Sequence, residues 1–595
     1  MSFVSPSDFR TRPDLRGTFG MCASTHWLAT QTAQSVLERG GNAFDASTAA
    51  AFVLYVVEPH LNGPGGDLVA IVAPASGEPS VLVGQGPAPA GATIDHFRAE
   101  GLDMVPAAGA LAAAVPGAVD AWLLLLRDYG TWELADVLAY AIDYAGNGHP
   151  LSERVGAVIG TVAEMFAEYW PTSAALWMPQ GVPPVADVMF RNPAFANTLD
   201  RLVSDSRHAP TRDTRIEAAR TIWKSGFVAE GIESFARNPH RHSSESDHAG
   251  VVTAGDMASF SAHYEAPVAF EFRGHTVLKG SSWGQGPVLL QALAILDGFP
   301  DEQIDPSTAV GAHHVLESLK LAMADRDAYY GENLSSEQLE LLLSPEYASV
   351  RRKEIGERAS QEFRPGACGL DPFFPPLVED TDAPRGGSSG EPTVSVTGET
   401  RGDTCHLDII DRWGNAVSAT PSGGWLQSSP TIPELGFALG TRLQMTWLDP
   451  ASPSALRPGH RPRTTLTPTM LLRGTEVVAA RGAEGGDQQD QWQLSYLLRT
   501  LVGGYTPQQA IDAPTFHTTS IPSSFWPRRW TPGGAVVEDR LGVDVITGLR
   551  ERGHRITVAG GWSLGRLSTV TRNPATGVLG AAANARGAQG YAAGR

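Results

Sequence analysis

The chain has 595 residues, a formal net charge of −19, and a composition that is 42% hydrophobic and 18% charged. Its length allows two to four domains or one large composite fold, and its composition is that of an ordinary folded protein with ample material for a core. The acidic balance argues against nucleic acid and against an anionic membrane surface as partners, because both attract basic surfaces.

The cysteines and the chain start narrow the class of protein further. Three scattered cysteines provide neither a disulfide framework nor the ligand spacing of a metal site. The first twenty residues lack the apolar core of a secretory signal, and the most apolar stretch, "ALAAAVPGAVDAWLLLL", is interrupted by Pro116 and Asp120. We therefore expect a cytoplasmic protein without a membrane span, a metal ion or an organic cofactor.

Helical and strand patterns alternate through the first half of the chain. Residues 26–57 predict two helices, the first ending at Gly40–Gly41 and the second starting after Asn42. The Gly/Pro-rich turn "EPHLNGPGGD" leads into the strand "LVAIVA", and "PSVLVGQGPAPA" predicts a second strand. Residues 105–330 are largely helical by pattern, with strand-like runs between 254 and 280. Within the predicted helix "HHVLESLKLAMADRDAYYG", His313 and His314 face different ways and predict no metal site.

The pattern changes at residues 364–403, which are dense in Pro, Gly, Ser and Asp. We expect this segment to be a flexible connector. The stretch "TCHLDIIDRWGNAVSAT" after it predicts a strand that begins with Thr404, a turn at Gly414–Asn415, and a returning strand. Short strands continue from there to the helical "QWQLSYLLRTLVGG". This layout predicts that both halves of the chain contribute to one sheet system.

A threonine that leads a strand after a flexible polar segment is typical of N-terminal-nucleophile (Ntn) hydrolases. A threonine hydroxyl is a weak nucleophile and needs an adjacent base. If the chain is cut before Thr404, the new α-amine becomes that base, with a roughly neutral pKa. The residues leave two alternatives open: Thr404 is an ordinary strand residue, and the neighbouring Cys405 is a buried apolar filler.

Several blocks resemble the γ-glutamyltranspeptidase family in the family's order. They include "ERGGNAFDASTAAAFVLYVVEPHLNGPGGD", "TAGDMASFSAHYEAPVAFEF", "DTCHLDIIDRWGNAVSAT", "RPRTTLTPTMLL", "RGAEGGDQQ" and "IDAPTFH". The resemblance implies an α/β fold, the four-layer αββα sandwich of the Ntn hydrolases. It also implies autocleavage between Asp403 and Thr404, which leaves a heavy chain of residues 1–403 and a light chain of residues 404–595. The family further implies a heterodimer of the two pieces, and leaves open a pairing of two such heterodimers.

The resemblance also assigns site residues. It implies that Thr404 is the nucleophile, that Ser422 supplies a hydroxyl near its amine, and that the backbone N–H groups of Gly485 and Gly486 form the oxyanion hole. Substrate-contacting positions fall on Cys405 (a second Thr in the family), His406, Thr464 and Thr465. Each keeps a structural alternative: a core histidine, ordinary strand threonines, or a plain Gly-Gly turn.

The family's grip on the γ-glutamyl group is mostly absent. Gln85 stands where the family has the arginine that binds the donor carboxylate, and a neutral amide cannot replace that charged contact. The acidic run that binds the donor amine is replaced by "GTRLQMTW". Arg442 and Arg463 are candidates to bind a substrate carboxylate from a new direction, although such arginines are often structural. These departures resemble the divergent branch that includes oxamate amidohydrolase-like members.

Three further residues flank this predicted pocket. Trp425 and Trp447 are predicted to line an apolar acyl pocket or, equally, to pack in the core. Asp487 is placed to orient a helix start, where a carboxylate suits the helix dipole.

The leading interpretation is an autoprocessed amidohydrolase that acts on a small-molecule amide, with glutathione a poor substrate. A true γ-glutamyl hydrolase or transpeptidase is the alternative within the enzyme class. An unprocessed, non-catalytic binding homologue is the alternative from another class. A cut before Cys405, with the thiol as nucleophile, is a third alternative for the chemistry.

Overall fold

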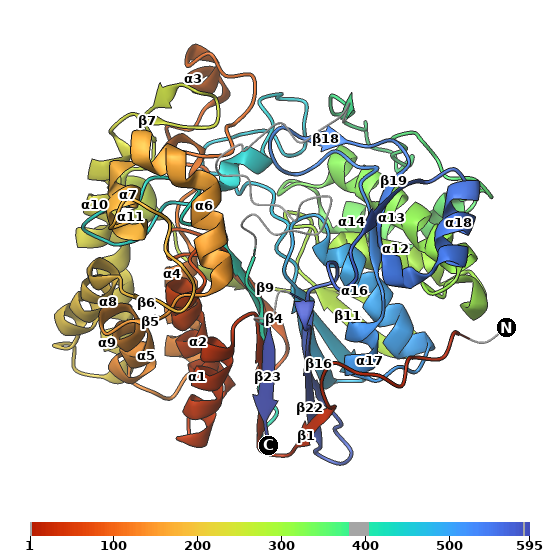
Figure 1. The fold of residues 1–595 in the computed structure, drawn as a ribbon, viewed down its shortest axis with the longest axis horizontal. Coiled ribbons are helices and arrows are strands. Elements are labelled where there is room, and N and C mark those ends of the chain that lie inside the picture. Colours follow the sequence, from red (N-terminus) through yellow and green to blue (C-terminus); the bar gives the residue numbers. More distant parts are fainter. Residues whose placement is uncertain (1–2, 380–403, 587–589) are drawn as a thin grey trace.

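Two antiparallel sheets form the centre of the computed structural model, which describes residues 3–379, 404–586 and 590–595 (Figure 1). Each has seven strands in the described part of the chain. The β13 sheet has the order β23 (Tyr591–Gly594), β2 (Gly20–Ser24), β13 (Leu407–Asp411), β14 (Ala416–Ser422), β3 (Asp67–Ala73), β4 (Ser80–Gly84) and β9 (His263–Glu265). The β16 sheet has the order β1 (Leu15–Gly17), β22 (Leu579–Ala583), β21 (Leu567–Arg572), β16 (Glu476–Ala483), β15 (Thr469–Arg473), β11 (His275–Lys279) and β10 (Val268–Phe272).

Helices cover the outer face of each sheet, so the prediction of a four-layer αββα sandwich is confirmed (Figure 1). On the β13 side lie α1 (Trp27–Glu38), α2 (Ala43–Val57), α4 (Ala118–Tyr129), α5 (Leu134–Gly146), α8 (Pro193–Ser206), α9 (Arg212–Ser225), α10 (Phe227–Ala236) and α11 (Ala254–Ser259). On the β16 side lie α12 (Pro287–Leu296), α13 (Ala309–Tyr329), α14 (Ser336–Leu342), α15 (Pro345–Arg352), α16 (Gln489–Leu497), α17 (Pro507–Asp512) and α18 (Val543–Glu551). Further helices are α3 (Ile94–Ala99), α6 (Glu153–Glu168) and α7 (Pro171–Trp177). A small third sheet holds β17 (Phe516–Thr518), β19 (Gly534–Glu538) and β20 (Arg555–Ala559).

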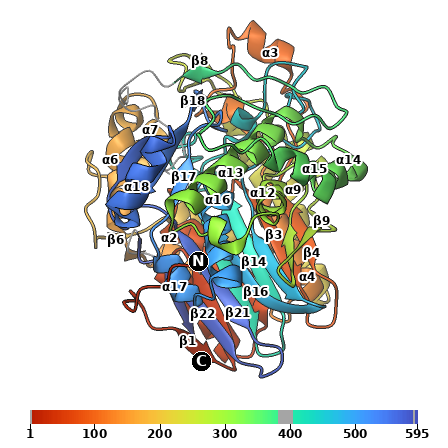
Figure 2. The ribbon, with the colours of Figure 1, turned by 90° about the vertical axis from the view of Figure 1, so that its right-hand side faces the viewer.

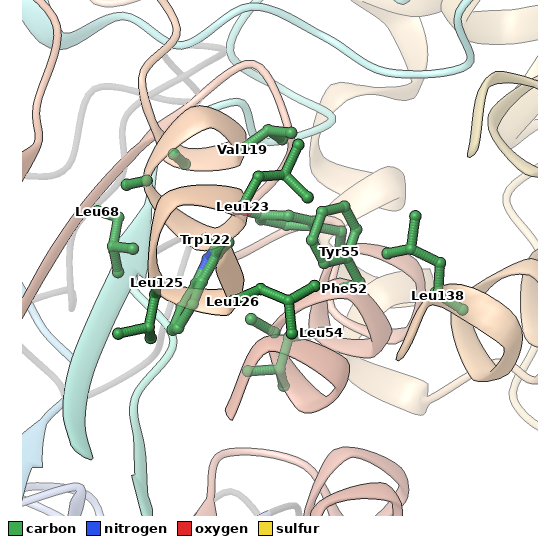
Figure 3. Close-up of a cluster of buried hydrophobic side chains, with 14 of the residues drawn as sticks. Phe52, Leu54, Tyr55, Leu68, Val119, Trp122, Leu123, Leu125, Leu126 and Leu138 are labelled. Atoms are coloured by element: carbon green, nitrogen blue, oxygen red, sulfur yellow. The ribbon is translucent and has the colours of Figure 1, made fainter. Parts of the chain in front are cut away.

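Three layers of apolar side chains hold the sandwich together. On the outer face of the β13 sheet, Phe52 and Tyr55 of α2 meet Trp122 of α4 above Leu68 of β3 (Figure 3). Between the sheets, Val69, Ile71 and Ala73 of β3 pack against the β16 sheet, because alternate residues of a strand point to opposite faces. Burying this much apolar surface is the main source of stability.

Both sheets contain strands from before and after Thr404 (Figure 2). In the β13 sheet, β13 lies between β2 and β14, and β14 lies between β13 and β3. In the β16 sheet, β15 pairs with β11. The prediction that both halves contribute to one sheet system is therefore confirmed.

The local sequence signals explain where the predicted elements begin and end. Asn42 caps α2 and shares a capping box with Asp45, so α2 starts where the sequence predicts. The predicted turn between β13 and β14 has Gly414 at φ +94°, a conformation that favours glycine. Among the described residues, no helix is both long and apolar enough to cross a bilayer.

The predicted connector differs from expectation in its first part. Residues 364–379 are bonded to the folded body: the Arg364 guanidinium binds Glu317 at 3.0 Å, and the Gly366 N–H donates to Asp325 at 2.7 Å. The strand β12 (Val378–Glu379) pairs in parallel with β18 (Arg529–Trp530). These contacts could not be predicted from the polar composition of the segment, because their partners are distant in the sequence. The rest of the connector, including Asp403, lies outside the described residues.

Candidate active site

Thr404 lies three residues before β13, at one end of the β13 sheet. It forms an antiparallel bridge with Ser422, the last residue of β14, and the Thr404 Oγ1 lies 3.2 Å from the Ser422 Oγ. The Cys405 N–H donates to the Pro421 carbonyl at 3.1 Å, which extends the pairing of the two strands. The structure thus brings together the two hydroxyls that the sequence places in one site.

The pleat of β13 sends neighbouring side chains to opposite faces. Cys405, Leu407 and Ile409 belong to the apolar cluster under the helices of the β13 side. His406 and Asp408 point between the sheets, where the Asp408 carboxylate accepts from Ser568 of β21 at 2.9 Å. By the same two-residue period, Thr404 lies on the inner face and Cys405 on the outer face.

Cys405 lies in a closed acidic environment. Its thiol donates to Glu58 at 3.0 Å, and the Thr25 hydroxyl donates to the same carboxylate oxygen at 2.6 Å. Burial, together with the Glu58 charge, raises the pKa of the thiol well above its usual value. Burial and the nearby Glu484 raise the pKa of Glu58 to about 7. The thiol thus faces away from Thr404 and binds Glu58, and a substrate contact of Cys405 stays a prediction that this geometry does not favour.

His406 is held on both sides within the sandwich. Its Nδ1 lies 2.9 Å from the Thr420 Oγ1, and its Nε2 lies 2.9 Å from the Asp408 carboxylate. The ring also packs on Gly482 of β16, where a Cβ would lie 2.1 Å from it. Both ring nitrogens are engaged within the β13 sheet, which favours the alternative of a core histidine; the substrate contact stays a prediction.

A buried ion pair lies beside Ser422. The Arg442 guanidinium binds Asp67, the residue paired with Ser422 across β14 and β3, through two nitrogens. Burial raises the pKa of Asp67, and Arg442 opposes that rise. Gln85, fully buried just after β4, lies beside this carboxyl and also lowers its pKa. Arg442 is thus paired with Asp67, which favours the structural alternative; its role in binding a substrate carboxylate stays a prediction.

Gly485 and Gly486 lie toward the Thr404 end of the sandwich. The Ser418 hydroxyl, level with Asp408, donates to the Arg481 carbonyl at 2.7 Å, and the next residue, Gly482, contacts His406. As its residue numbers rise, β16 therefore runs toward the end of the sandwich where Thr404 lies. The glycine pair, which follows β16, is at that end. Gly485 has φ +110°, and a Cβ on Gly486 would lie 2.3 Å from the Phe525 ring. Glycine is required at both positions, as an oxyanion hole and a tight turn both demand.

The predicted threonine pair lies on a loop that meets the loop of Trp283 and Gly284. Thr464 forms a parallel bridge with Gly284, and its N–H donates to the Trp283 carbonyl at 3.3 Å. The Thr464 hydroxyl accepts from the Leu466 N–H at 3.2 Å, so part of its bonding is local. Thr465 is equally buried. The pair precedes β15 in the β16 sheet, the sheet whose β16 strand leads to Gly485.

Sequence reasoning missed a buried charge cluster behind the glycine pair. Asp487 does not orient the start of α16: it binds Arg326 of α13 and accepts from the Ser524 N–H at 2.8 Å. Arg326 also binds Asp327 at 3.0 Å. Arg463 reaches the same aspartate at 3.5 Å. The polar run "GGDQQDQWQ", which contains Asp487, was the available signal.

Both tryptophans predicted to line a pocket are buried. The Trp425 indole N–H donates to the Leu61 carbonyl at 2.7 Å, which ties the loop after Ser422 to the turn before β3. Trp447 lies under the Arg528 guanidinium, whose central carbon is 3.9 Å from the ring centre. Trp425 therefore has a structural role, and the core reading offered for it is the one that the geometry favours.

One group of possible metal ligands gathers far from Thr404 in the sequence. Ligand atoms of His313, Glu317 and His554 lie within 4.8 Å of one another. However, the two histidines hydrogen-bond each other at 2.9 Å, and Glu317 binds Lys320 at 2.7 Å and Arg364 at 3.0 Å. Because the carboxylate is already neutralised by two cations, the group has the character of a structural network.

Comparison with known proteins identifies the family. The gamma-glutamyltranspeptidase family model matches residues 29–594. The chain belongs to the γ-glutamyltranspeptidase family. Two relatives illustrate its range. The glutathione hydrolase-like YwrD proenzyme of Bacillus subtilis is 30% identical, over 91% of this chain and 92% of its own. The oxamate amidohydrolase proenzyme of Klebsiella pneumoniae is 28% identical, over 97% of this chain and 98% of its own.

Solved structures of the family share the fold over the whole chain. The structure of LmbA2991HD is 51% identical, with a TM-score of 0.93 over 99% of this chain and 100% of its own. The cephalosporin acylase of Bacillus halodurans is 29% identical, with a TM-score of 0.82 over 99% of this chain and 98% of its own. The relatives are named hydrolases and acylases that act on amide bonds, and this chain is an enzyme of the same family.

Proposed function

We propose that this enzyme cuts itself before Thr404 and then hydrolyses a small amide through an acyl-Thr404 intermediate. The observation that carries the proposal is the placement of the Thr404 hydroxyl, 3.2 Å from Ser422, at the end of the sandwich where Gly485 and Gly486 also lie. The proenzyme names of both relatives support processing into a heavy chain, residues 1–403, and a light chain, residues 404–595.

The first reaction is an acyl shift within the chain. The Thr404 Oγ attacks the carbonyl carbon of Asp403, a C–O bond forms, and the C–N bond between the two residues breaks. Water then hydrolyses the ester, which frees the hydroxyl and leaves an α-amine on Thr404. Strands from the two pieces pair with each other in each sheet, so the cut chain stays together.

The second reaction repeats the attack on substrate. The α-amine takes the hydroxyl proton as the Thr404 Oγ bonds to the amide carbon, and it returns that proton to the leaving nitrogen as the C–N bond breaks. N–H groups of Gly485 and Gly486 stabilise the oxyanion. Ser422 orients the nucleophile from the neighbouring strand. Water then attacks the ester, and the acid leaves.

Two features argue against a γ-glutamyl donor. Gln85 replaces the arginine that the family uses for the donor carboxylate, and Arg442 is neutralised by Asp67. A buried arginine already held by a carboxylate gains little from a second one, because breaking the pair leaves a charge uncompensated. We therefore place the substrate among small amides other than glutathione, with hydrolysis preferred to transfer.

The test joins processing to turnover. Purified protein is expected to give two pieces of roughly two thirds and one third of the 63.1 kDa chain, with Thr at the start of the smaller one. Amine release is then compared between γ-glutamyl-p-nitroanilide, oxamate and simple acyl amides. Rapid γ-glutamyl turnover would identify a true γ-glutamyl hydrolase. One intact chain without activity would identify a binding homologue, and a smaller piece that starts with Cys would move the nucleophile to Cys405.

A further inference from the structure

Two buried arginines from the second half of the chain, Arg463 and Arg528, lie in the charge cluster next to Asp487. Arg463 has 3% of its surface exposed. Its only ion pair among the described residues is the 3.5 Å contact with Asp327, and its Nη1 is buried without a hydrogen-bond partner. A buried, partly unpaired guanidinium is costly unless another anion completes its bonding.

The charges of the cluster do not balance. It contains three guanidinium groups, from Arg326, Arg463 and Arg528, and two carboxylates, from Asp327 and Asp487. Arg326 binds both aspartates closely, so it uses most of the available negative charge. These five side chains therefore carry one excess positive charge in a buried position.

Arg528 contributes to this excess while its position is fixed from the other side. One of its terminal nitrogens donates to the backbone carbonyls of Gln444 and Thr446, each at 2.6 Å. Its guanidinium lies over the Trp447 ring. Carbonyl oxygens and a ring face hold the group in place without cancelling its charge, so Arg528 is presented as a rigid cation.

Two chains of contacts lead from the Thr404 end of the sandwich to this cluster, one from Thr404 itself and one from His406. Along the inner face of the β13 sheet, Ser422 leads to Asp67 and Arg442, and the loop that follows Arg442 holds Arg528. Across the sandwich, the strand that packs on His406 runs through the glycine pair to Asp487. A group attached to Thr404 would thus find the two arginines on the far side of Gly485 and Gly486.

We propose that Arg463 and Arg528 form a carboxylate-binding subsite, and that the substrate is therefore the monoamide of a short dicarboxylic acid. This inference rests on the proposed function and names its substrate class. A guanidinium fork suits a carboxylate, which accepts two parallel hydrogen bonds. One excess positive charge matches a monoanion better than a dianion such as phosphate.

The electrostatics of the two arginines agree with this reading. Burial and the neighbouring Arg326 lower the pKa of Arg463 to about 10. Burial and Arg463 lower the pKa of Arg528 to about 9. Both groups stay charged at neutral pH, and an anion that binds between them would relieve part of their mutual repulsion.

The experiment measures a ratio, so that partial loss of folded protein cancels. Monoamides of oxalic, malonic, succinic and glutaric acid are each compared with the neutral methyl-ester counterpart, and kcat/KM is obtained for both members of each pair. Arg463→Met is expected to lower the acid-to-ester ratio on the order of 100-fold, as loss of a charge-assisted contact does. Arg463→Lys, which keeps the charge, is expected to retain part of the ratio. Arg461→Met is the matched control, because Arg461 binds Glu265 and Glu332, and its ratio should equal that of the unsubstituted enzyme.

A binding measurement separates this inference from the proposed function. Malonate and succinate are titrated into the processed enzyme by calorimetry, and binding of at least one is expected to weaken strongly in Arg463→Met. A processed enzyme that prefers the esters, that shows the same ratio in Arg463→Met, or that binds neither dicarboxylate overturns the subsite and leaves the amidohydrolase intact. An unprocessed, inactive protein that binds dicarboxylates overturns the proposed function instead.

Discussion

The two faces of the chain at Thr404–Cys405 put two adjacent nucleophilic side chains into opposite environments. The Thr404 hydroxyl lies on the inner face beside Ser422, near the end of β16 where the glycine pair lies. The Cys405 thiol lies on the outer face against Glu58, under the helices of the β13 side. The strand pleat alone makes this division, because it turns each side chain away from its neighbour.

In the proposed mechanism, the placement of the two side chains outweighs their intrinsic reactivity. A thiol is the better nucleophile in isolation, but only as the thiolate. Burial and Glu58 raise the pKa of Cys405 well above its usual value, so the thiol stays protonated. A hydroxyl beside a newly formed amine needs no ionised form at rest, since the amine removes its proton during attack.

Removing the inner-face hydroxyl should have the largest effect. Thr404→Ala is expected to remain one chain of 63.1 kDa and to hydrolyse no amide, because the attacking atom is absent. Thr404→Ser keeps that atom and should still be cut. Denaturing electrophoresis over time and amine release measure both steps. A cleaved Thr404→Ala protein would assign the cut to another residue.

A substitution that disturbs the packing of the inner face should have the second-largest effect. Gly482→Ala would place a Cβ 2.1 Å from the His406 ring, which is fixed by Thr420 and Asp408 and cannot move away cheaply. We expect a loss of about 3 kcal/mol or more, at the upper end for overpacked cores, and slower processing. Thermal unfolding measures the loss. Gly560→Ala is the control, because no atom lies within 4 Å of its added Cβ, and an equal loss in both variants would contradict the packing account.

The contact that orients the nucleophile should have an intermediate effect. Ser422→Ala removes the oxygen 3.2 Å from the Thr404 Oγ and leaves the β14 backbone pairing in place. Processing and kcat are each expected to fall about 10-fold to 100-fold, the range for loss of one positioned polar group. Ser422→Thr keeps the oxygen and should recover much of both rates. If the two variants behave alike, the hydroxyl has no orienting role.

The elements around these residues were largely predictable from sequence, because their signals are local. Asn42 and its capping box, and the turn at Gly414–Asn415, need only neighbouring residues. The direction of Cys405 was also within reach, since Leu407 and Ile409 share its parity and are apolar. The αββα arrangement came from the family resemblance, not from these patterns.

The ion pairs of the site were out of reach of sequence patterns. Asp67 and Arg442 are separated by 375 residues, and Arg326 and Asp487 by 161. Only the register of the sheets brings them together, so an arginine that looks free in sequence can be fully occupied in the fold. The pairing of Arg442 could not be foreseen for this reason. Arg528 was missed because an irregular loop without any recurring pattern precedes it.

On the outer face, the acid beside Cys405 should make stability depend on pH. The native pKa of Glu58 is about 7, above its usual 4.5, so its contribution to stability is present at low pH and is lost as pH rises through that window. From pH 5 to pH 8, the free energy of unfolding of Glu58→Gln should therefore rise by about 2 to 3 kcal/mol relative to that of the unsubstituted enzyme. Thermal midpoints at the two pH values measure this. Glu217→Gln is the control: Arg220 and Arg127 outweigh burial and hold the pKa of Glu217 below its usual value, so its loss should be equal at both pH values.

The outer-face thiol itself should matter least. Cys405→Ala removes one buried sulfur and its bond to Glu58, while Thr25 still donates to that carboxylate. We expect cleavage at the unsubstituted rate and a stability loss of about 1 kcal/mol, because only a small group leaves the core. Intact mass and N-terminal sequencing of the smaller piece check the cut. Cys405→Ser should behave in the same way, since neither the thiol nor a hydroxyl on this face can reach around the strand. A Cys405→Ala protein that stays uncut, next to a Thr404→Ala protein that is cut, would reverse the roles of the two faces and assign the attack to sulfur.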